Sequence, residues 1–282
     1  MEMKNLQLLM SVLECRCGGN ITVSNKNIVC DKGCGKEFGL TTSGSGIILE
    51  EVHKVENKTP RPLKISKTTL DRKGGNWRTQ NFKLTRDWVN KFSNSDLLVD
   101  IGCGPLTNQE LLKERNTIYI DGADFDGINL VCDFSKSLPM KQNSIDGILC
   151  SNVIEHLPEP QVCFNEIHRV MKSGGEALIL VPFIIKLHQE PYDFHRYTKY
   201  ALKFYAKKAG FSIVDVKEVG GISNILGTIL KTAIKVSSNP IYKLGLRSQY
   251  FIWRVLRKLF DDDSPSAILP QGYALYLKKN SN

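Results

Sequence analysis

Residues 99–112 read VDIGCGPLTNQELL, and this stretch decides the fold class. Its apolar start predicts that residues 97–101 (LLVDI) form a buried strand. Gly102 and Gly104 then allow a tight turn and the close approach of a ligand to the backbone. A helix that starts directly after such a turn offers free N–H groups to an anion such as a carboxylate. The stretch therefore predicts a strand–turn–helix unit that binds a nucleotide-like ligand.

The residues after the turn narrow the choice of ligand. The dinucleotide fingerprint requires a third glycine where this chain has Thr107, which counts against NAD, and a Walker loop is absent. An acid at the end of the second strand would bind ribose hydroxyls, and Asp121 lies 19 residues after Gly102. Asp124 and Asp126 are alternatives for that role.

Helix and strand patterns alternate from Trp77 onward. This alternation predicts an α/β fold with a Rossmann-like, seven-stranded, mostly parallel sheet that has helices on both faces. Only seven residues separate Asp121 from Asn129, too few for a crossover helix. The seven strands are expected at 97–101, 117–120, 129–132, 147–150, 176–182, 211–217 and 273–278.

The helix boundaries are predicted from capping residues and glycines. TNQE (107–110) has the spacing of a capping box, which predicts a helix through Arg115. An apolar helical period covers 160–171, and the glycines at 174–175 are expected to stop that helix. Thr198 is positioned to cap a further helix.

Four longer stretches resemble the class I S-adenosylmethionine-dependent methyltransferases of the type 11 group. They are VDIGCG (99–104), CDFSKSLPMKQNSIDGILCSNVIEHL (132–157), EIHRVMKSGGEALILVPF (166–183) and HQEPYDFHRYTKYALKFYAKKAGF (188–211), in the family's order. Leu106 departs from the family, which usually has a third glycine there.

The resemblance implies S-adenosylmethionine as cofactor and assigns a role to each matching residue. The methionine part would lie against Asp100, Gly102, Cys103 and Gly104, and the ribose against Asp121. Asp133 and Phe134 would contact the adenine, while Ser151 and Asn152 would line the methyl-bearing end with His156 nearby.

The segment after the fifth predicted strand concentrates polar side chains where ligands bind such sheets. Methyl transfer needs a base only if the acceptor must lose a proton. His188 or His195 is a candidate base or substrate contact, with Asp193 beside them. The residues leave open a structural alternative, in which Asp193 and Arg196 pair to fix the loop.

Residues 1–50 form a cysteine-rich segment that resembles a zinc ribbon. Its four cysteines, Cys15, Cys17, Cys30 and Cys34, would give a closed tetrahedral zinc site. One residue separates the first two cysteines and three separate the last two, whereas zinc ribbons usually have two and two. A ribbon fold that has lost its metal is therefore the alternative. The four other cysteines, Cys103, Cys132, Cys150 and Cys163, are expected to be buried apolar side chains.

Two further segments flank or interrupt the domain expected at 77–282. Residues 51–76 are polar and basic and are expected to be a linker. An insert at 221–270 contains two amphipathic stripes, and its 221–260 part has seven Lys or Arg and no acid. Such helices either lie on an anionic membrane surface or form a lid over the acceptor pocket, packed with the apolar side down.

Composition limits the class of protein but not its partner. At 41% apolar and 24% charged, the 282 residues predict a globular protein, and the longest apolar run, 177–185, is far below the roughly 20 residues of a spanning helix. The N-terminus lacks a small-residue cleavage site, so a cytoplasmic location is expected. The net charge of +9 permits nucleic acid, an anionic membrane or an acidic substrate.

Three functions follow from these observations. The first is methyl transfer to a small-molecule, sugar or lipid-linked acceptor. The second is methylation of rRNA or tRNA, against which stands the lack of a basic stretch interleaved with aromatic residues. The third is a non-catalytic, cofactor-binding activator of another methyltransferase, against which stands the intact set of acid and glycines at 100–104.

Overall fold

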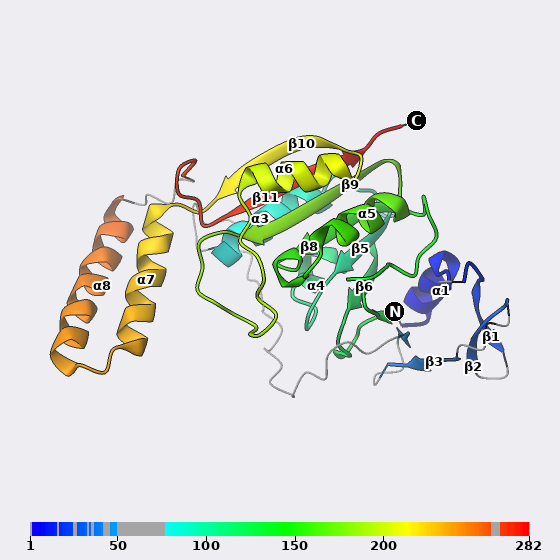
Figure 1. Ribbon diagram of the computed structural model, residues 1–282, viewed down its shortest axis with the longest axis horizontal. Helices are drawn as coiled ribbons and strands as arrows, with labels where there is room; N and C mark the ends of the chain where they lie inside the picture. Colours follow the sequence, from blue (N-terminus) through cyan, green and yellow to red (C-terminus); the bar gives the residue numbers. More distant parts are fainter. Residues whose placement is uncertain are drawn as a thin grey trace.

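The computed structural model describes residues 2–15, 17–24, 27–32, 34, 37–41, 46–49, 77–260 and 266–281. The expected linker, 51–76, lies outside the described residues, as do residues 261–265 of the insert. Figure 1 shows a central sheet with helices on its faces, a small N-terminal part at one edge and a pair of long helices beyond the opposite edge.

All seven strands expected from the sequence are present in one sheet, in the order β7-β6-β5-β8-β9-β11-β10. The pairs from β7 to β9 are parallel, and β11 runs antiparallel to both of its neighbours. The Rossmann-like fold class is therefore confirmed. The strands are β5 (Leu97–Ile101), β6 (Asn116–Asp121), β7 (Leu130–Val131), β8 (Ile145–Ser151), β9 (Met171–Pro182), β10 (Phe211–Val219) and β11 (Gly272–Lys279).

Each face of this sheet has its own apolar core. Strand β5 is buried along its whole length, with Val99 in one core and Leu98 in the other, because successive side chains point to opposite faces. Helices α5 (Pro160–Val170) and α6 (Lys199–Lys208) cover the first face through residues such as Phe164 and Leu202. Helices α3 (Trp77–Val89) and α4 (Gln109–Leu112) cover the second through Trp88 and Leu112.

Two helix boundaries differ from the prediction. The capping box at 107–110 does not form: α4 starts at Gln109 and ends at Leu112, well before Arg115, and its N-cap residue Asn108 makes no side-chain cap hydrogen bond. The Asn108 amide instead donates to the buried carboxylate of Asp100, so a tertiary contact replaces the local cap.

The glycines at 174–175 do not stop α5, which ends at Val170, and β9 begins at the next residue. Met171 is already extended and pairs with Ile145 of β8, so sheet pairing ends the helix before the glycines are reached. The other boundary predictions are confirmed. The Thr198 hydroxyl accepts from the Ala201 N–H at the start of α6, and residues 122–129, all described, contain turns and no helix.

The N-terminal part continues the main sheet. It consists of α1 (Glu2–Val12), β1 (Ile21–Ser24), β2 (Asn27–Cys30), β3 (Glu37–Leu40) and β4 (Ile47–Ile48). Strands β1 to β4 pair antiparallel in order, and β4 pairs in parallel with β7. Leu9 and Leu13 are fully buried in the same core as Val99, so this part shares its apolar interior with the main sheet.

The insert forms two helices, α7 (Ile222–Val236) and α8 (Pro240–Phe260), which pack on each other and project beyond the sheet (Figure 1). Trp253 of α8 fits against Gly227 of α7, and its indole N–H donates to the Ser223 carbonyl. The lid with its apolar side packed down is therefore wrong, because the pair leaves most of its large apolar side chains exposed. None of the helices that the structure describes has the length and apolarity needed to cross a bilayer.

Candidate active site

The glycine turn at the carboxyl end of β5 has the conformation that glycine permits. Gly102 and Gly104 have φ of 67° and 55°. A Cβ atom on Gly102 would lie 2.3 Å from Cγ2 of Val153, so the turn also needs the missing side chain there. Leu106, where the resembling family has a glycine, adopts a φ of 54° despite its side chain.

Asp121 lies beside this turn because β6 pairs in parallel with β5. Its carboxylate accepts from the Gly104 N–H (2.8 Å) and from the Ala123 N–H (3.1 Å). These bonds fix the acid at the turn, and its role as the ribose ligand stays a prediction.

Asp100 is buried beneath the turn with one oxygen unsatisfied. The Asn108 amide donates to Oδ2 (3.3 Å), whereas Oδ1 has no hydrogen-bond partner among the described residues. Burial raises the pKa of Asp100 to about 7, and the nearby charge of Asp121 adds to this rise while the bond from Asn108 opposes it. A buried orphan acceptor of this kind fits a ligand that brings a positively charged donor. Cys103 is buried beside it and stays a predicted contact.

The loop after β7 and the end of β8 complete the predicted cofactor contacts. Asp133 accepts from the Ser135 N–H and pairs with Lys136 (2.9 Å), which leaves Phe134 partly buried next to it. Their contact with adenine stays a prediction.

At the end of β8, Asn152 has a φ of 57° and donates from its amide to the Ser151 hydroxyl. The Trp77 indole N–H donates to the Asn152 side-chain oxygen (3.1 Å). Sequence reasoning missed Trp77, because this contact joins two residues that are 75 positions apart.

A buried acid next to these residues was also missed. Glu155 is fully buried in the short helix η1 (Ile154–His156), and neither of its oxygens has a hydrogen-bond partner among the described residues. His156 Nε2 lies 3.7 Å from Glu155 Oε1, and His188 Nε2 lies 3.9 Å from the same oxygen. Burial raises the pKa of Glu155 to about 8. The only sequence signal was its position directly before His156, inside a stretch used for the family resemblance.

Of the three predicted catalytic residues, His188 and Asp193 contact each other, and the ring of His195 points to a different partner. His188 is partly buried and lies in a cluster with Glu155 and His156. Asp193 is held by a bidentate pair with Arg196 (2.6 and 2.7 Å) and accepts from the His188 N–H, so its pKa lies well below the usual range. The structural reading of the Asp193–Arg196 pair is therefore the one that the geometry supports. The ring of His195 contacts the carbonyl of Pro158 through Nε2 (3.3 Å) instead of the Glu155 carboxylate, and its backbone N–H donates to the Glu155 carbonyl.

Comparison with known proteins agrees with this geometry. Residues 99–179 match the model of a family described as a methyltransferase domain. This match covers the glycine turn, Asp121 and the end of β8. By this match, residues 99–179 resemble a methyltransferase domain.

Curated relatives of this domain match over parts of their length. An uncharacterised protein of Methanocaldococcus jannaschii is 34% identical over 105 residues, which are 33% of this chain and 44% of that protein. Cycloartenol-C-24-methyltransferase 1 of Oryza sativa is 32% identical over 69 residues, which are 23% of this chain and 20% of that protein. The chain thus spans less than half the length of the curated relatives that it matches.

Among solved structures, the crystal structure of the (4+2)-cyclase SpnF has a TM-score of 0.50 at 17% identity and covers 74% of this chain and 85% of that one. This likeness shows a shared fold and carries no information on chemistry, since one fold supports many reactions.

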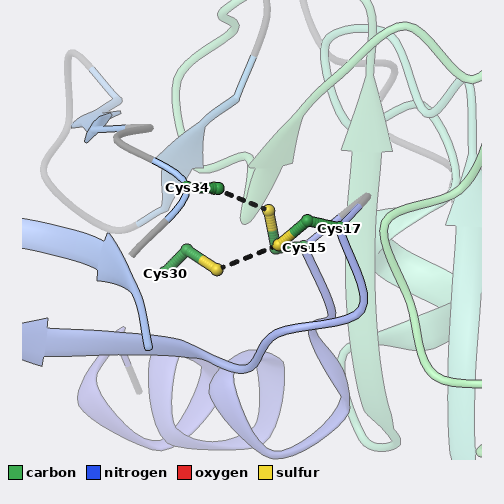
Figure 2. A group of neighbouring side chains, drawn as sticks. All are labelled: Cys15, Cys17, Cys30 and Cys34. Atoms are coloured by element: carbon green, nitrogen blue, oxygen red, sulfur yellow. Dashed lines mark hydrogen bonds between the residues drawn. The ribbon is translucent and has the colours of Figure 1, made fainter. Parts of the chain in front are cut away.

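Ahead of the methyltransferase domain, the four N-terminal cysteines converge as Figure 2 shows. Cys15 Sγ lies 3.7 Å from Cys34 Sγ, Cys17 Sγ lies 3.3 Å from Cys30 Sγ, and all four sulfurs lie within 4.8 Å of one another. A Cβ atom on Gly19 would lie 2.5 Å from Cys30 Sγ, which explains a glycine there. The four other cysteines are buried as expected.

Proposed function

We propose that this chain transfers a methyl group from S-adenosylmethionine to an acceptor. The observation that carries this proposal is the glycine turn between two acids: Asp121 beside it and Asp100 beneath it, with one buried oxygen unsatisfied. Asp100 would accept from the cofactor's ammonium group and Asp121 from its ribose hydroxyls. When bound, the cofactor supplies a methyl group already activated by its sulfonium, so the protein's contribution is orientation.

Calorimetry tests the cofactor directly. S-adenosylhomocysteine should bind to the full chain, and NAD should not. Binding of NAD together with indifference to S-adenosylhomocysteine would overturn the assignment.

We further propose that the acceptor is lipid-linked or otherwise partly apolar and anionic, and that it is met at an anionic membrane surface. The α7–α8 pair supports this. The two most exposed large apolar side chains of the pair, Ile241 (82%) and Val236 (74%), lie at its tip, where α7 ends and α8 begins, and Leu244 beside them is 67% exposed. Exposed apolar side chains gathered in this way mark a contact site rather than ordinary surface.

The charge of the pair selects the kind of contact. Residues 221–260 carry seven cationic side chains and no acid, and Lys235 and Lys243 flank the apolar tip. A helix pair with apolar residues beside lysine and arginine suits the interface of a bilayer that contains anionic lipid. Each cation near such a surface contributes about 1 kcal/mol of attraction. The pair therefore matches an anionic membrane in both apolarity and charge.

Vesicle sedimentation with the full chain tests the membrane contact. Vesicles that contain phosphatidylserine should sediment the chain, and pure phosphatidylcholine vesicles should sediment much less of it. Ile241→Ser/Leu244→Ser should lower binding at least tenfold, and Lys235→Glu/Lys243→Glu should remove the preference for anionic lipid.

The matched controls change similar side chains elsewhere. Val214→Ser alters an apolar residue of β10 that is 54% exposed, and Lys207→Glu/Lys208→Glu alters exposed cations of α6; both should bind vesicles like the wild type. If Lys207→Glu/Lys208→Glu lost as much vesicle binding as Lys235→Glu/Lys243→Glu, the binding would depend on net charge alone and not on the tip of the helix pair. Concentration-dependent dimers that Ile241→Ser/Leu244→Ser abolishes, without vesicle binding, would assign the pair to a second copy of this chain. Salt-dependent RNA binding that requires the same cations would favour the RNA alternative.

The cysteine cluster supports a structural zinc ion. Four thiolates at a Zn–S distance of about 2.3 Å place neighbouring sulfurs about 3.8 Å apart in a tetrahedron, close to the separations seen here. The fully thiolate donor set leaves no open position, so the ion would stabilise the N-terminal part without taking part in the reaction. Elemental analysis should show one equivalent of zinc that Cys30→Ser removes.

A further inference from the structure

Glu155, His156 and His188 form a cluster around a carboxyl group that is buried without a hydrogen-bond partner in the part of the chain that the structure describes. Glu155 is fully buried, and both of its oxygens lack hydrogen-bond partners among the described residues. Burial of a carboxylate without a partner is unfavourable, so the group needs either a proton or a cation. One ligand atom from each of the three residues lies within 4.8 Å of the other two.

Both histidines are held so that Nε2 faces this carboxylate. His156 Nδ1 lies 2.7 Å from the Tyr192 carbonyl, which can only accept, so Nδ1 carries the proton and Nε2 keeps its lone pair. His156 Nε2 is itself buried and has no hydrogen-bond partner among the described residues. The ring of His188 has a looser outer contact: its Nδ1 lies 3.4 Å from Asp193 Oδ2 and forms no hydrogen bond with the described residues.

Asp193 faces the ring of His188 in addition to its ion pair with Arg196. The bidentate pair fixes the carboxylate that faces His188 Nδ1. Histidines that bind metals usually contact a carboxylate or a backbone carbonyl through the other ring nitrogen, which fixes the tautomer and the ring. His188 has the first kind of outer contact and His156 the second.

We propose that Glu155 Oε1, His156 Nε2 and His188 Nε2 bind a divalent first-row transition-metal ion such as Zn²⁺. Two imidazoles and one carboxylate are a donor set that such ions accept, and three protein ligands leave a coordination position open. Metal–ligand distances of about 2.0–2.2 Å place neighbouring ligand atoms about 3.3 Å apart, so the side chains would close by roughly half an ångström from their present 3.7 and 3.9 Å.

The open position suggests a use, which rests on the proposed methyl transfer. Glu155 and His156 follow β8 directly, and β8 is the parallel neighbour of β5, so the cluster lies at the sheet edge that carries the glycine turn. A metal ion there would bind a hydroxyl oxygen of the acceptor and lower its pKa, so that the O–H proton passes to solvent water. The oxygen would then form a C–O bond to the methyl group as the bond between that methyl group and the sulfonium sulfur breaks, and S-adenosylhomocysteine would leave. The acceptor class would then be a hydroxyl, phenol or carboxyl compound.

Metal loading of the full chain tests the site without any acceptor. After incubation with Zn²⁺ or Co²⁺ and gel filtration, wild type should retain one equivalent at this site in addition to the one at the cysteines. In the Co²⁺ form, the thiolate site gives sulfur-to-metal charge-transfer bands, which a site of nitrogen and oxygen ligands lacks. His188→Ala and Glu155→Gln should each lower the metal content by one equivalent and leave the charge-transfer bands unchanged.

His195→Ala is the matched control, because it removes a histidine of the same loop whose ring contacts Pro158 instead. It should retain the full metal content. His188 is only partly buried, so its variant should fold even if the Glu155 variant does not.

The proposal is overturned if wild type retains metal only in the form that shows charge-transfer bands, and neither variant changes the amount. Glu155 would then be a buried acid that carries a proton instead of a metal ion. Binding of S-adenosylhomocysteine is measured in parallel: if it binds and the second metal does not, the metal site fails while the methyl-transfer proposal stands.

Discussion

At the scale of single residues, the site depends on acids whose environments differ. Asp121 is held at the rim of the glycine turn by backbone N–H groups, whereas Asp100 lies beneath the turn in the core. The first is suited to accept from hydroxyl groups in its ionised form. The second favours the protonated form until a cation arrives, because burial disfavours its charge.

Asp121→Ala should weaken the binding of S-adenosylhomocysteine by about tenfold or more, since each charge-assisted hydrogen bond contributes about 1.5–3 kcal/mol. Calorimetric titration measures the change. Asp124→Ala is the control and should bind almost as the wild type does. If the control loses affinity and Asp121→Ala does not, the ribose ligand has been assigned to the wrong acid.

Asp100 predicts a pH dependence of stability. Its pKa rises on folding from 3.8 to about 7, so the folded chain holds this proton more tightly than the unfolded chain. The stabilising effect is complete below the unfolded pKa and is lost as the pH rises toward about 7, with a slope of at most about 1.4 kcal/mol per pH unit.

Urea denaturation between about pH 4 and pH 7 should show this decline, and Asp100→Asn should make it shallower, with the raised pKa of Glu155 leaving a remaining slope of the same sign. Asp87→Asn, which changes an exposed acid of α3, is the control and should keep the wild-type slope. An unchanged slope in Asp100→Asn would mean that the carboxyl group is already ionised in the folded chain.

At the scale of elements, α7 and α8 approach each other most closely where Trp253 packs on Gly227. A Cβ atom on Gly227 would lie 2.3 Å from Cη2 of Trp253. Gly227→Ala should therefore separate the helices and lower their stability by about 1–3 kcal/mol. Hydrogen exchange of residues 222–260 should accelerate while the affinity for S-adenosylhomocysteine stays unchanged.

Gly245→Ala provides the comparison within the same pair. A Cβ atom there meets nothing within 4 Å, and alanine favours a helix over glycine by up to about 1 kcal/mol. It should slow exchange in α8 or leave it unchanged. Equal acceleration in both variants would show that the contact between Trp253 and Gly227 does not hold the pair together.

At the scale of the whole molecule, the N-terminal part and the main part of the sheet share one core. Leu9, Leu13 and Ile47 are fully buried in the cluster that also contains Val99 and Phe164. Strand β4 extends the sheet by pairing with β7. The two parts should therefore unfold together.

Removal of the proposed zinc ion should accordingly destabilise the entire chain. Cys30→Ser should give a single calorimetric transition that is several degrees below that of the wild type, because about 1 kcal/mol shifts Tm by about 2–4 °C at this size. Cys163→Ala, at a buried cysteine outside the cluster, should keep its zinc. Two separate transitions in Cys30→Ser would show that the N-terminal part unfolds by itself.

The sequence by itself determined the features that depend on neighbouring residues. Strands read from apolar runs all appear, and so do the glycine turn, the cap at Thr198 and the absence of a helix between Asp121 and Asn129. These depend on backbone conformation, side-chain periodicity and chain length, which local sequence specifies.

Only the tertiary structure decided which residues that are distant in the sequence contact each other. Asn108 bonds Asp100 instead of capping its helix, β8 ends α5 by pairing with Met171, and the helix pair projects instead of covering the sheet. Glu155 and His188 are far apart in the sequence and meet only because β8 and β9 are parallel and end at the same edge of the sheet. Burial and convergence of this kind arise from the packing of the whole chain, so no local pattern encodes them.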